Sequence, residues 1–251
     1  MKETFLVLLT AHLIGDFLFQ NNWMVRTKDT KIWCLLLHAA IVAASTFIVA
    51  GYLEKSFAML FYCWVFLAHF FIDWMKGLIG SIKWISQLNK KNEVYIFLID
   101  QFGHIASLMV IAYAMPDVAG KSLWLELFPV FYFTGLTLIS GFVVCVFAGG
   151  VLISKATRPL VEQIKDNESN GLKNGGRYIG QLERTLTFFF MLTGQTSAIG
   201  FLFAAKSILR FGEIKDSEKR KQAEYIIIGS FMSFGWALVI AYLTGKAITL
   251  W

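Results

Sequence analysis

The feature that most constrains this chain is a series of apolar segments, each about 20 residues long, separated by short polar stretches. A helix of that length crosses a hydrocarbon core of roughly 30 Å. The composition agrees, because 57% of the 251 residues are hydrophobic and only 16% are charged, against about 25% in soluble domains. The sequence therefore predicts an all-α fold, a polytopic bundle of transmembrane helices.

Six segments are predicted to span the membrane, and a seventh apolar segment is interrupted. The predicted spans are residues 4–20, 32–53, 57–75, 94–115, 129–153 and 224–245. The seventh segment, residues 178–211, is too long for one perpendicular crossing and has the polar sequence Thr-Gly-Gln-Thr-Ser at its middle. It is either one tilted helix or a hairpin of two short helices.

Basic residues favour the hairpin through the positive-inside rule. Lysines and arginines are dense in residues 155–177 and again in residues 206–221, on either side of the seventh segment. Only a re-entrant or short helical hairpin returns both regions to the cytoplasm, where the other basic loops also lie. We therefore predict six spans plus this hairpin in the inner (cytoplasmic) membrane of a bacterium, with both termini outside.

The net charge of +6 follows from this topology and from contact with anionic lipid. No nucleic-acid partner is expected; the expected partners are membrane lipid, a lipid-linked substrate and a further copy of the chain. Residues 78–91, between the third and fourth spans, combine apolar residues at helical spacing with lysines. They predict a short helix at the membrane interface.

The first four predicted spans contain four histidines and three aspartates. These are His12, Asp16, His38, His69, Asp73, Asp100 and His104. A charged aspartate at the centre of a transmembrane helix costs about 2.5–3.5 kcal/mol on insertion scales, so each aspartate needs a partner inside the bundle. Ionisable residues in such positions are candidates for a functional site.

Three of the histidines are four residues away from an aspartate. The pairs are His12 with Asp16, His69 with Asp73, and His104 with Asp100. Side chains at this spacing share one helix face, about 5–6 Å apart. If the helices alternate in direction, the four histidines also fall at one level, in the cytoplasmic half of the bilayer. The sequence therefore predicts a single site on four helices.

A weak internal repeat supports this arrangement. Residues 11–17 and 68–74 align without a gap, and each is followed by a returning helix with one histidine. Two hairpins related by a pseudo-two-fold axis along the membrane normal would explain the repeat. We predict a four-helix part that carries His and Asp, residues 1–115, and a second membrane part with cytoplasmic basic loops and the hairpin, residues 116–251.

Imidazole and carboxylate groups together are suitable ligands for Zn²⁺, Mn²⁺ or Fe²⁺. Zinc is the expected metal, and the ligands could hold one ion or two. The predicted metal ligands are His12, Asp16, His38, His69, Asp73 and His104. A bound metal would lower the pKa of a water molecule toward about 7, and Asp100 or Asp73 would be the catalytic base.

The second part carries a candidate site for a phosphate or a lipid headgroup. Its predicted residues are Arg177, Arg184, Lys206 and Arg210, near a glycine pair whose backbone N–H groups would be free at a helix N-terminus. The alternative is that these side chains pair structurally or extend to the interface. The chain has no P-loop, no G-x-S-x-G and no H-E-x-x-H motif, which argues against nucleotide hydrolysis, serine hydrolases and zincins.

The motifs resemble the signature of an uncharacterised bacterial membrane family, a domain of unknown function, over residues 4–115. The resembling motifs are His12-x-x-Gly15-Asp16-x-x-x-Gln20, His38, His69-x-x-x-Asp73-x-x-Lys76 and Asp100-Gln101-x-x-His104. The second part is similar to the longer members of that family. This resemblance implies membership but no activity. In residue types alone, the site is also similar to intramembrane metal hydrolases of the ceramidase kind.

The expected function is that of an intramembrane metal-dependent enzyme, a hydrolase or phosphatase of a lipid or lipid-linked substrate at the cytoplasmic leaflet. Two alternatives stay open. In one, the same residues form an ion or proton path in a transporter or channel. In the other, they pair structurally in a regulatory membrane protein, through hydrogen bonds worth about 0.6–2 kcal/mol each.

Overall fold

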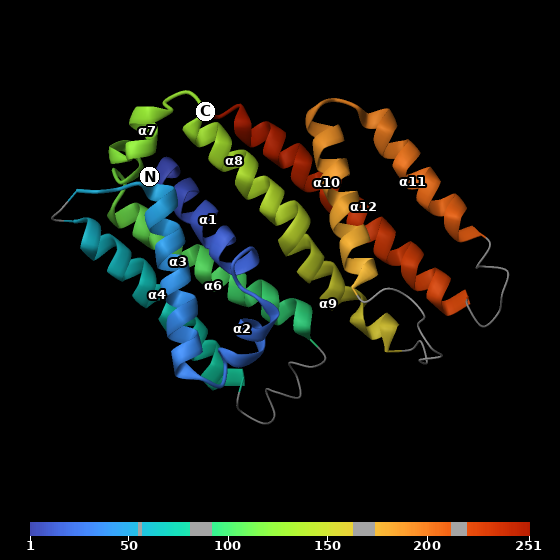
Figure 1. Cartoon of the computed structure of the whole chain (residues 1–251), viewed down its shortest axis with the longest axis horizontal. Coiled ribbons are helices and arrows are strands. Elements are labelled where there is room, and N and C mark those ends of the chain that lie inside the picture. Colours follow the sequence, from blue (N-terminus) through green and yellow to red (C-terminus); the bar gives the residue numbers. More distant parts are fainter. Residues whose placement is uncertain (55–56, 81–91, 163–173, 212–219) are drawn as a thin grey trace. The chain divides into compact units, whose positions relative to one another are not determined.

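The computed structural model describes the backbone of residues 1–54, 57–80, 92–162, 174–211 and 220–251, and the side chains of these residues except 209–211 and 220. Every secondary-structure element assigned in these ranges is a helix, which confirms the predicted all-α class (Figure 1). The predicted interfacial helix falls mainly on residues 81–91, outside the described residues. The chain forms two compact units, Met1–Val143 with Trp251 and Val144–Leu250, and each is described by itself.

The first unit contains every helix that carries a histidine. Its helices are α1 (Lys2–Phe17), α2 (Asn22–Thr27), α3 (Ile32–Ala50), α4 (Ala58–Gly80), α6 (Glu93–Ala114), η1 (Ala119–Lys121), α7 (Leu123–Leu127) and α8 (Tyr132–Val143). Local sequence sets several ends. The Asn21 side chain caps α2 by accepting a hydrogen bond of 2.8 Å from the Met24 amide. Gly51 ends α3 at φ 53°, in the left-handed region that glycine adopts without strain.

Helices α1, α3, α4 and α6 form a closed ring in the first unit. Helix α1 packs against α3 and α6, and α4 also packs against α3 and α6 (Figure 1). The buried core of the unit includes Val7, Leu8, Val42, Phe61 and Ile111. Helix α8 packs on α1, where the hydroxyl oxygens of Thr10 and Ser140 lie 2.7 Å apart. The predicted parts meet at residue 115, whereas the compact units meet at Val143 because α8 belongs to the first unit.

Gly15 allows α1 and α3 to approach closely. A Cβ atom at this position would lie 2.8 Å from Val42 Cγ2, a distance that Cβ atoms essentially never show without a shift, and 3.2 Å from Val42 Cα, which is tighter than most Cβ contacts. Asp16 directly follows Gly15, and His38 lies one turn before Val42. The close contact therefore brings Asp16 and His38 toward each other.

The C-terminal end of α3 is fixed by a separate set of contacts, away from His38. Tyr52 and Ser122 form an isolated antiparallel bridge. The indole N–H of Trp124 donates a hydrogen bond of 2.6 Å to the Ile48 carbonyl, and Lys121 pairs with Glu54 at 2.6 Å on the surface. These contacts join the connection after α3 to the start of α7.

The second unit contains a short π-helix at its start. Its elements are η2 (Val144–Ala148), α9 (Gly149–Val161), α10 (Gly175–Leu192), α11 (Thr196–Phe211) and α12 (Arg220–Ile248). The element η2 is a π-helix, whose altered hydrogen-bond pattern leaves carbonyl groups available. The Arg184 guanidinium donates to the Val146 carbonyl at 2.9 and 3.2 Å, and Trp236 Nε1 donates to the Val144 carbonyl at 3.1 Å.

The interrupted apolar segment forms two helices, α10 and α11, that pack against each other. The break falls at Thr193–Gln195, within the polar sequence that predicts it, and Gly194 there has φ 74°. The segment is therefore not one continuous helix. That this pair of helices is a re-entrant hairpin is part of the topology proposed below.

Five helices in the described ranges are long and apolar enough to cross a membrane by length and composition. They are Ile32–Ala50, Ala58–Gly80, Glu93–Ala114, Tyr132–Val161 and Lys221–Ile248. Helix α1, a predicted span, has 16 residues and is shorter than a typical full crossing. Large apolar side chains such as Leu67, Phe71 and Phe102 are exposed, while His69 and His104 on the same helices are buried. This inverted pattern is the one expected of a protein whose solvent is lipid.

Candidate metal centre

Four helices of the first unit direct ionisable side chains into one buried cluster, here named the His/Asp centre. Its members are His12 and Asp16 on α1, His38 on α3, His69 and Asp73 on α4, and Asp100 and His104 on α6. Each histidine is at most 4% exposed. The structure therefore brings together every histidine and aspartate of the first four predicted spans.

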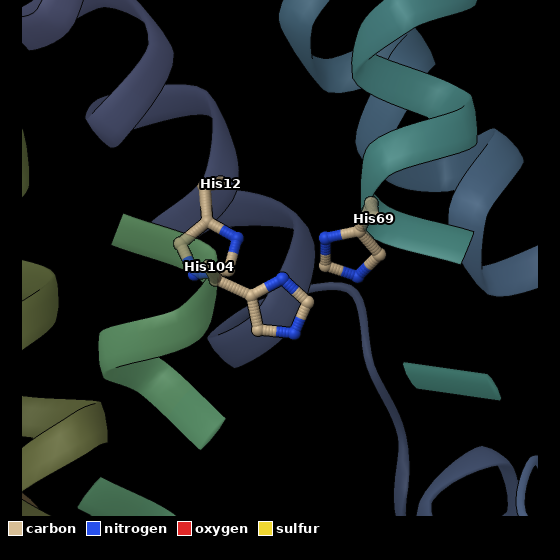
Figure 2. A group of neighbouring side chains, drawn as sticks. All are labelled: His12, His69 and His104. Atoms are coloured by element: carbon tan, nitrogen blue, oxygen red, sulfur yellow. The ribbon is translucent and has the colours of Figure 1, made fainter. Parts of the chain in front are cut away.

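The imidazole rings lie against one another inside the ring of helices. Figure 2 shows His12, His69 and His104 pointing toward a common region from three helices. The ring centroids lie 4.3 Å apart for His69 and His104, 5.0 Å for His12 and His104, and 4.9 Å for His38 and His69. Like charges so close together repel in a buried site. An imidazole that is neutral offers one nitrogen lone pair to a ligand.

Three ligand atoms of the centre have the spacing of a metal coordination shell. The Nε2 atoms of His38 and His69 lie 3.0 Å apart. Asp16 Oδ1 lies 3.4 Å from the first and 3.5 Å from the second. A tetrahedral zinc ion with bonds of about 2.0–2.1 Å separates its ligand atoms by about 3.3 Å. The three atoms thus match one face of such a tetrahedron.

Asp73 lies between this set and the remaining residues of the centre. Its Oδ2 atom is 3.4 Å from His38 Nε2 and 3.5 Å from His69 Nε2. The same oxygen accepts a hydrogen bond of 2.8 Å from the Lys28 ammonium, which is itself buried. The other oxygen, Oδ1, faces His104 Nε2 at 3.7 Å.

Asp100 and Lys76 complete the centre on the side of α6. The Lys76 ammonium lies 3.1 Å from Asp100 Oδ2 and 3.7 Å from Asp73 Oδ1. Asp100 Oδ1 faces His104 Nε2 at 3.8 Å. The Lys76 side chain is 32% exposed, whereas the Asp73 side chain is 1% exposed. The centre therefore reaches solvent or lipid headgroups through Lys76.

Many polar atoms of the centre lack hydrogen bonds. The buried atoms without a hydrogen-bond partner among the described residues include His12 Nδ1 and Nε2, Asp16 Oδ1, His38 Nδ1, Asp73 Oδ1, Asp100 Oδ1 and His104 Nε2. An unsatisfied buried group costs about 1–3 kcal/mol, and folded proteins contain few of them. Their concentration here indicates a centre built for a ligand that accepts lone pairs.

The charges of the centre indicate that such a ligand would be a cation. Three carboxylates face two ammonium groups, those of Lys28 and Lys76, and neither lysine is described in contact with Asp16. The ion-pair contacts found for Asp16 among the described residues are with the imidazoles of His12, His38 and His69. A buried carboxylate needs a counter-charge. Either one imidazole is protonated or a cation binds between them.

Lys28 is the member of the centre that sequence reasoning missed. The sequence places it in a basic cytoplasmic loop, and nothing in its spacing relates it to Asp73. The structure returns it to the centre because the Asn21 cap starts a short helix, α2, which ends beside Lys28. Lys76, one turn beyond Asp73 on the same helix, does carry a signal in the sequence.

The predicted headgroup residues of the second unit have different surroundings. The Arg184 guanidinium donates to the Val146 carbonyl and to the Ser233 hydroxyl, and the Lys206 ammonium pairs with Glu183 at 2.7 Å. Arg177 is exposed in the first turn of α10, and the Arg210 side chain is outside the described residues. The described contacts do not join Arg184 to Lys206, and a phosphate site here stays a prediction.

Comparison with known families places the His/Asp centre inside one of them. The family described as "Protein of unknown function (DUF3307)" matches residues 4–130, just over half of the chain. The chain belongs to the DUF3307 family. The DUF3307 region contains all seven members of the centre, together with Lys28 and Lys76, and excludes Arg184. No curated protein and no solved structure matches the chain.

Proposed function

We propose that this DUF3307 protein binds a divalent metal in the His/Asp centre and is an intramembrane metal-dependent hydrolase or phosphatase. Its substrate would be a lipid or lipid-linked molecule at the cytoplasmic leaflet of a bacterial inner membrane. One observation carries the proposal. The Nε2 atoms of His38 and His69 and the Oδ1 atom of Asp16 lie 3.0–3.5 Å from one another, as ligands of one ion do.

The donor set supports zinc as the metal. Two imidazoles and one carboxylate form the ligand set of several catalytic zinc sites, in which a water molecule takes the fourth position. Mn²⁺ and Fe²⁺ accept the same donors. The three free thiols of the chain, Cys34, Cys63 and Cys145, are not among the described groups of candidate ligands. A thiolate-seeking metal therefore has no support from these groups.

The chemistry of the proposed reaction follows from the neighbours of the three ligands. A bound metal would activate a water molecule as the nucleophile. Asp73, within 3.5 Å of both imidazole nitrogens, would take the proton of that water as general base. The oxygen of the water would bond to the phosphorus or carbonyl carbon of the substrate, and the departing alcohol oxygen would take up a proton. Lys28 and Lys76 would stabilise the negative charge that develops.

The proposed topology places the centre in the inner half of the bilayer. It has six spans and the α10–α11 hairpin, with both termini outside, and it rests on the positive-inside rule. Cysteine labelling at residues 177 and 219 tests it. Both positions should react from the cytoplasmic side, and labelling from opposite sides would refute the hairpin topology.

A proton or ion path is the second candidate function, and the continuity of the rings favours it. His38, His69, His104 and His12 form an unbroken series with centroid distances of 4.9, 4.3 and 5.0 Å. Asp100 and the partly exposed Lys76 continue this series toward the surface. Such series of His, Asp and Lys side chains serve proton transfer in pumps and transporters.

Metal analysis of the purified full-length protein tests the primary proposal. We expect at least one zinc, manganese or iron ion per chain after purification without chelators. The His69→Ala variant should lose it, and Glu126→Gln, a change at an exposed carboxylate on α7, should keep it. Metal-free wild-type protein that also fails to take up added Zn²⁺, Mn²⁺ or Fe²⁺ would overturn the metal centre.

The reaction needs a second measurement. Cells that overproduce the wild-type protein should show a changed amount of one lipid class, and cells with the Asp73→Ala variant should not. If the protein holds metal but the lipids of the two strains are the same, the hydrolase is refuted. Proton or ion flux into proteoliposomes would then test the transport function.

A further inference from the structure

The Asp73 carboxylate lies between two groups of candidate ligands, and its two oxygens face different groups. Oδ2 faces the Nε2 atoms of His38 and His69, at 3.4 and 3.5 Å. Oδ1 faces His104 Nε2 at 3.7 Å. A carboxylate with this orientation can bind one metal ion through each oxygen. The first set, Asp16, His38 and His69, forms the proposed metal site, and Asp73, Asp100 and His104 form a second set of candidate ligands.

The second set consists of three atoms that form no hydrogen bond among the described residues. Asp73 Oδ1, Asp100 Oδ1 and His104 Nε2 are buried, and none forms a hydrogen bond with another described residue. His104 Nε2 lies 3.7 Å from the first oxygen and 3.8 Å from the second. These residues form a group whose ligand atoms lie within 4.8 Å of one another. The spacing is slightly wider than in the first set, and its carboxylate and imidazole donors suit Mn²⁺ or Fe²⁺ as well as zinc.

We propose that the centre is dinuclear: a second divalent metal ion binds to Asp100, His104 and Asp73, and Asp73 bridges the two ions. This inference rests on the proposed metal site formed by Asp16, His38 and His69. With both Asp73 oxygens bound to metal, the general base of the dinuclear centre would be Asp100, through its Oδ2 atom, instead of Asp73. In two-metal hydrolytic sites the ions are about 3.5–4 Å apart. The two imidazoles that would serve the different ions, His69 and His104, are stacked with centroids 4.3 Å apart.

His12 supplies a further ligand for the second ion. Both of its ring nitrogens are buried and lack a hydrogen-bond partner within the described ranges. Its ring lies 5.0 Å from that of His104 and 5.5 Å from that of His69 (Figure 2). His12 also belongs to a group of candidate ligands with these two histidines. His12 Nδ1 faces Asp16 Oδ1 at 3.8 Å, and neither ring nitrogen forms a hydrogen bond with a described residue, so binding of a metal would use a nitrogen that is otherwise unbonded.

Lys76 is the natural competitor of the second ion. Its ammonium lies 3.1 Å from Asp100 Oδ2 and 3.7 Å from Asp73 Oδ1, and its side chain is 32% exposed. It can therefore leave when a divalent ion binds. Lys28 is held differently, because it is buried and bonds to the oxygen of Asp73 that faces the first set. Two divalent ions and Lys28 outweigh the three carboxylates in charge, so the loaded centre attracts an anion such as a phosphate group.

Titration of the purified full-length protein with Mn²⁺ tests the second position without reference to activity. We expect two ions per chain, with the electron paramagnetic resonance spectrum of a spin-coupled pair. The Asp100→Asn variant should bind one ion with the spectrum of an isolated Mn²⁺. Asp100→Glu should restore the second ion, which a merely structural role of Asp100 would not predict. Glu126→Gln should behave as wild type.

The Lys76→Gln variant provides an independent readout. Removing the competing ammonium should tighten binding of the second ion by about tenfold and leave the first ion unchanged. One ion per chain in both the wild type and Asp100→Asn would overturn the second position and leave the proposed function intact. No ion in either protein would overturn the proposed metal site itself. Circular dichroism of each variant would identify any that fail to fold.

Discussion

Both units bury ionisable side chains among apolar helices, but they treat them differently. In the second unit, Arg184 donates to the Val146 carbonyl and the Ser233 hydroxyl, and Glu183 pairs with Lys206. In the first unit, the imidazoles and carboxylates of the His/Asp centre converge while many of their polar atoms lack partners within the described ranges. Burial of charge alone therefore does not identify a binding site. The first unit differs in that several buried ligand atoms converge without hydrogen-bond partners among the described residues, in groups that could hold a metal ion.

The largest expected effect is on metal affinity, which substitutions in the first unit should change and substitutions in the second unit should not. The His38→Ala variant removes a proposed ligand that is completely buried, and we expect zinc affinity to fall by at least about 100-fold. The Arg184→Leu variant changes an equally buried charge and should leave affinity within a factor of about two. Competition with a chromophoric chelator measures both. Equal losses in the two variants would mean that the units do not differ as described.

The second prediction concerns the sign of a stability change in metal-free protein. Asp16→Asn removes a buried carboxylate whose described ion-pair contacts are all with imidazoles, so it should stabilise the protein by about 1–3 kcal/mol when a chelator is present. Arg184→Leu should destabilise it by about 1–3 kcal/mol, because the Val146 carbonyl loses its donor. Denaturant unfolding in detergent measures both changes.

Zinc should offset the first of these stability changes. With zinc present at about 100 times its Kd, the wild type should gain about 2.7 kcal/mol, and Asp16→Asn should gain much less. If Asp16→Asn destabilises the metal-free protein instead, the carboxylate already has its counter-charge and an imidazolium holds the centre together.

A smaller effect is expected from the packing that positions the centre. Gly15→Ala would place a Cβ 2.8 Å from Val42 Cγ2, so α1 and α3 must move apart, at a cost of about 1–3 kcal/mol. Because Asp16 and His38 move with them, metal affinity should also fall. Gly200→Ala in α11 is the matched control, since no heavy atom of the described residues, apart from its chain neighbours and the backbone of its own helix, lies within 4 Å of its Cβ position. If Gly15→Ala lowers stability without changing metal affinity, the close contact of α1 and α3 does not position the metal ligands.

The smallest effect should come from the exposed ion pair of Lys121 and Glu54, which serves as a reference for the buried groups. The hydrogen bond from Lys121 lowers the pKa of Glu54. A carboxyl group with a lowered pKa stabilises the folded state above its unfolded pKa, about 4.3, and this contribution disappears as pH falls through the folded value. Thermal midpoints of wild type and Glu54→Gln should therefore differ slightly at pH 7 and converge as the pH falls below the lowered pKa of Glu54 in the folded state. A loss of bound metal in Glu54→Gln would show that the reference is unsuitable.

The sequence predicts the centre well where its features depend only on residues within one helix. The spacing of His69 and Asp73 places both on one face, and the cost of burying Asp73 requires partners. The break between α10 and α11 is also visible, because Gly194 and its polar neighbours interrupt an apolar segment. These features depend on residues within a few positions of one another.

Features that depend on tertiary contacts could not be predicted from the sequence. Lys28 enters the centre only because α2 reverses the chain after α1, and the sequence around it resembles any basic loop. The π-helix at Val144–Ala148 is stabilised by donors from α10 and α12, Arg184 and Trp236, far away in sequence. The role of Asp73 as a link between two ligand sets likewise depends on the directions of its two oxygens, which spacing does not specify.

The short helix α2 has a consequence for the rate at which the centre could exchange its ion. Lys28 follows this six-residue helix and lies over the Asp73 carboxylate, and the buried Met24 anchors the same helix. An ion bound beside Lys28 would be released toward this side only as often as α2 moves away, however weakly its ligands hold it. The partly exposed Lys76 gives the other side of the centre a separate route to the surface. Replacing Asn21, the cap of α2, would then accelerate exchange of the ion beside Lys28 more than it would change its affinity.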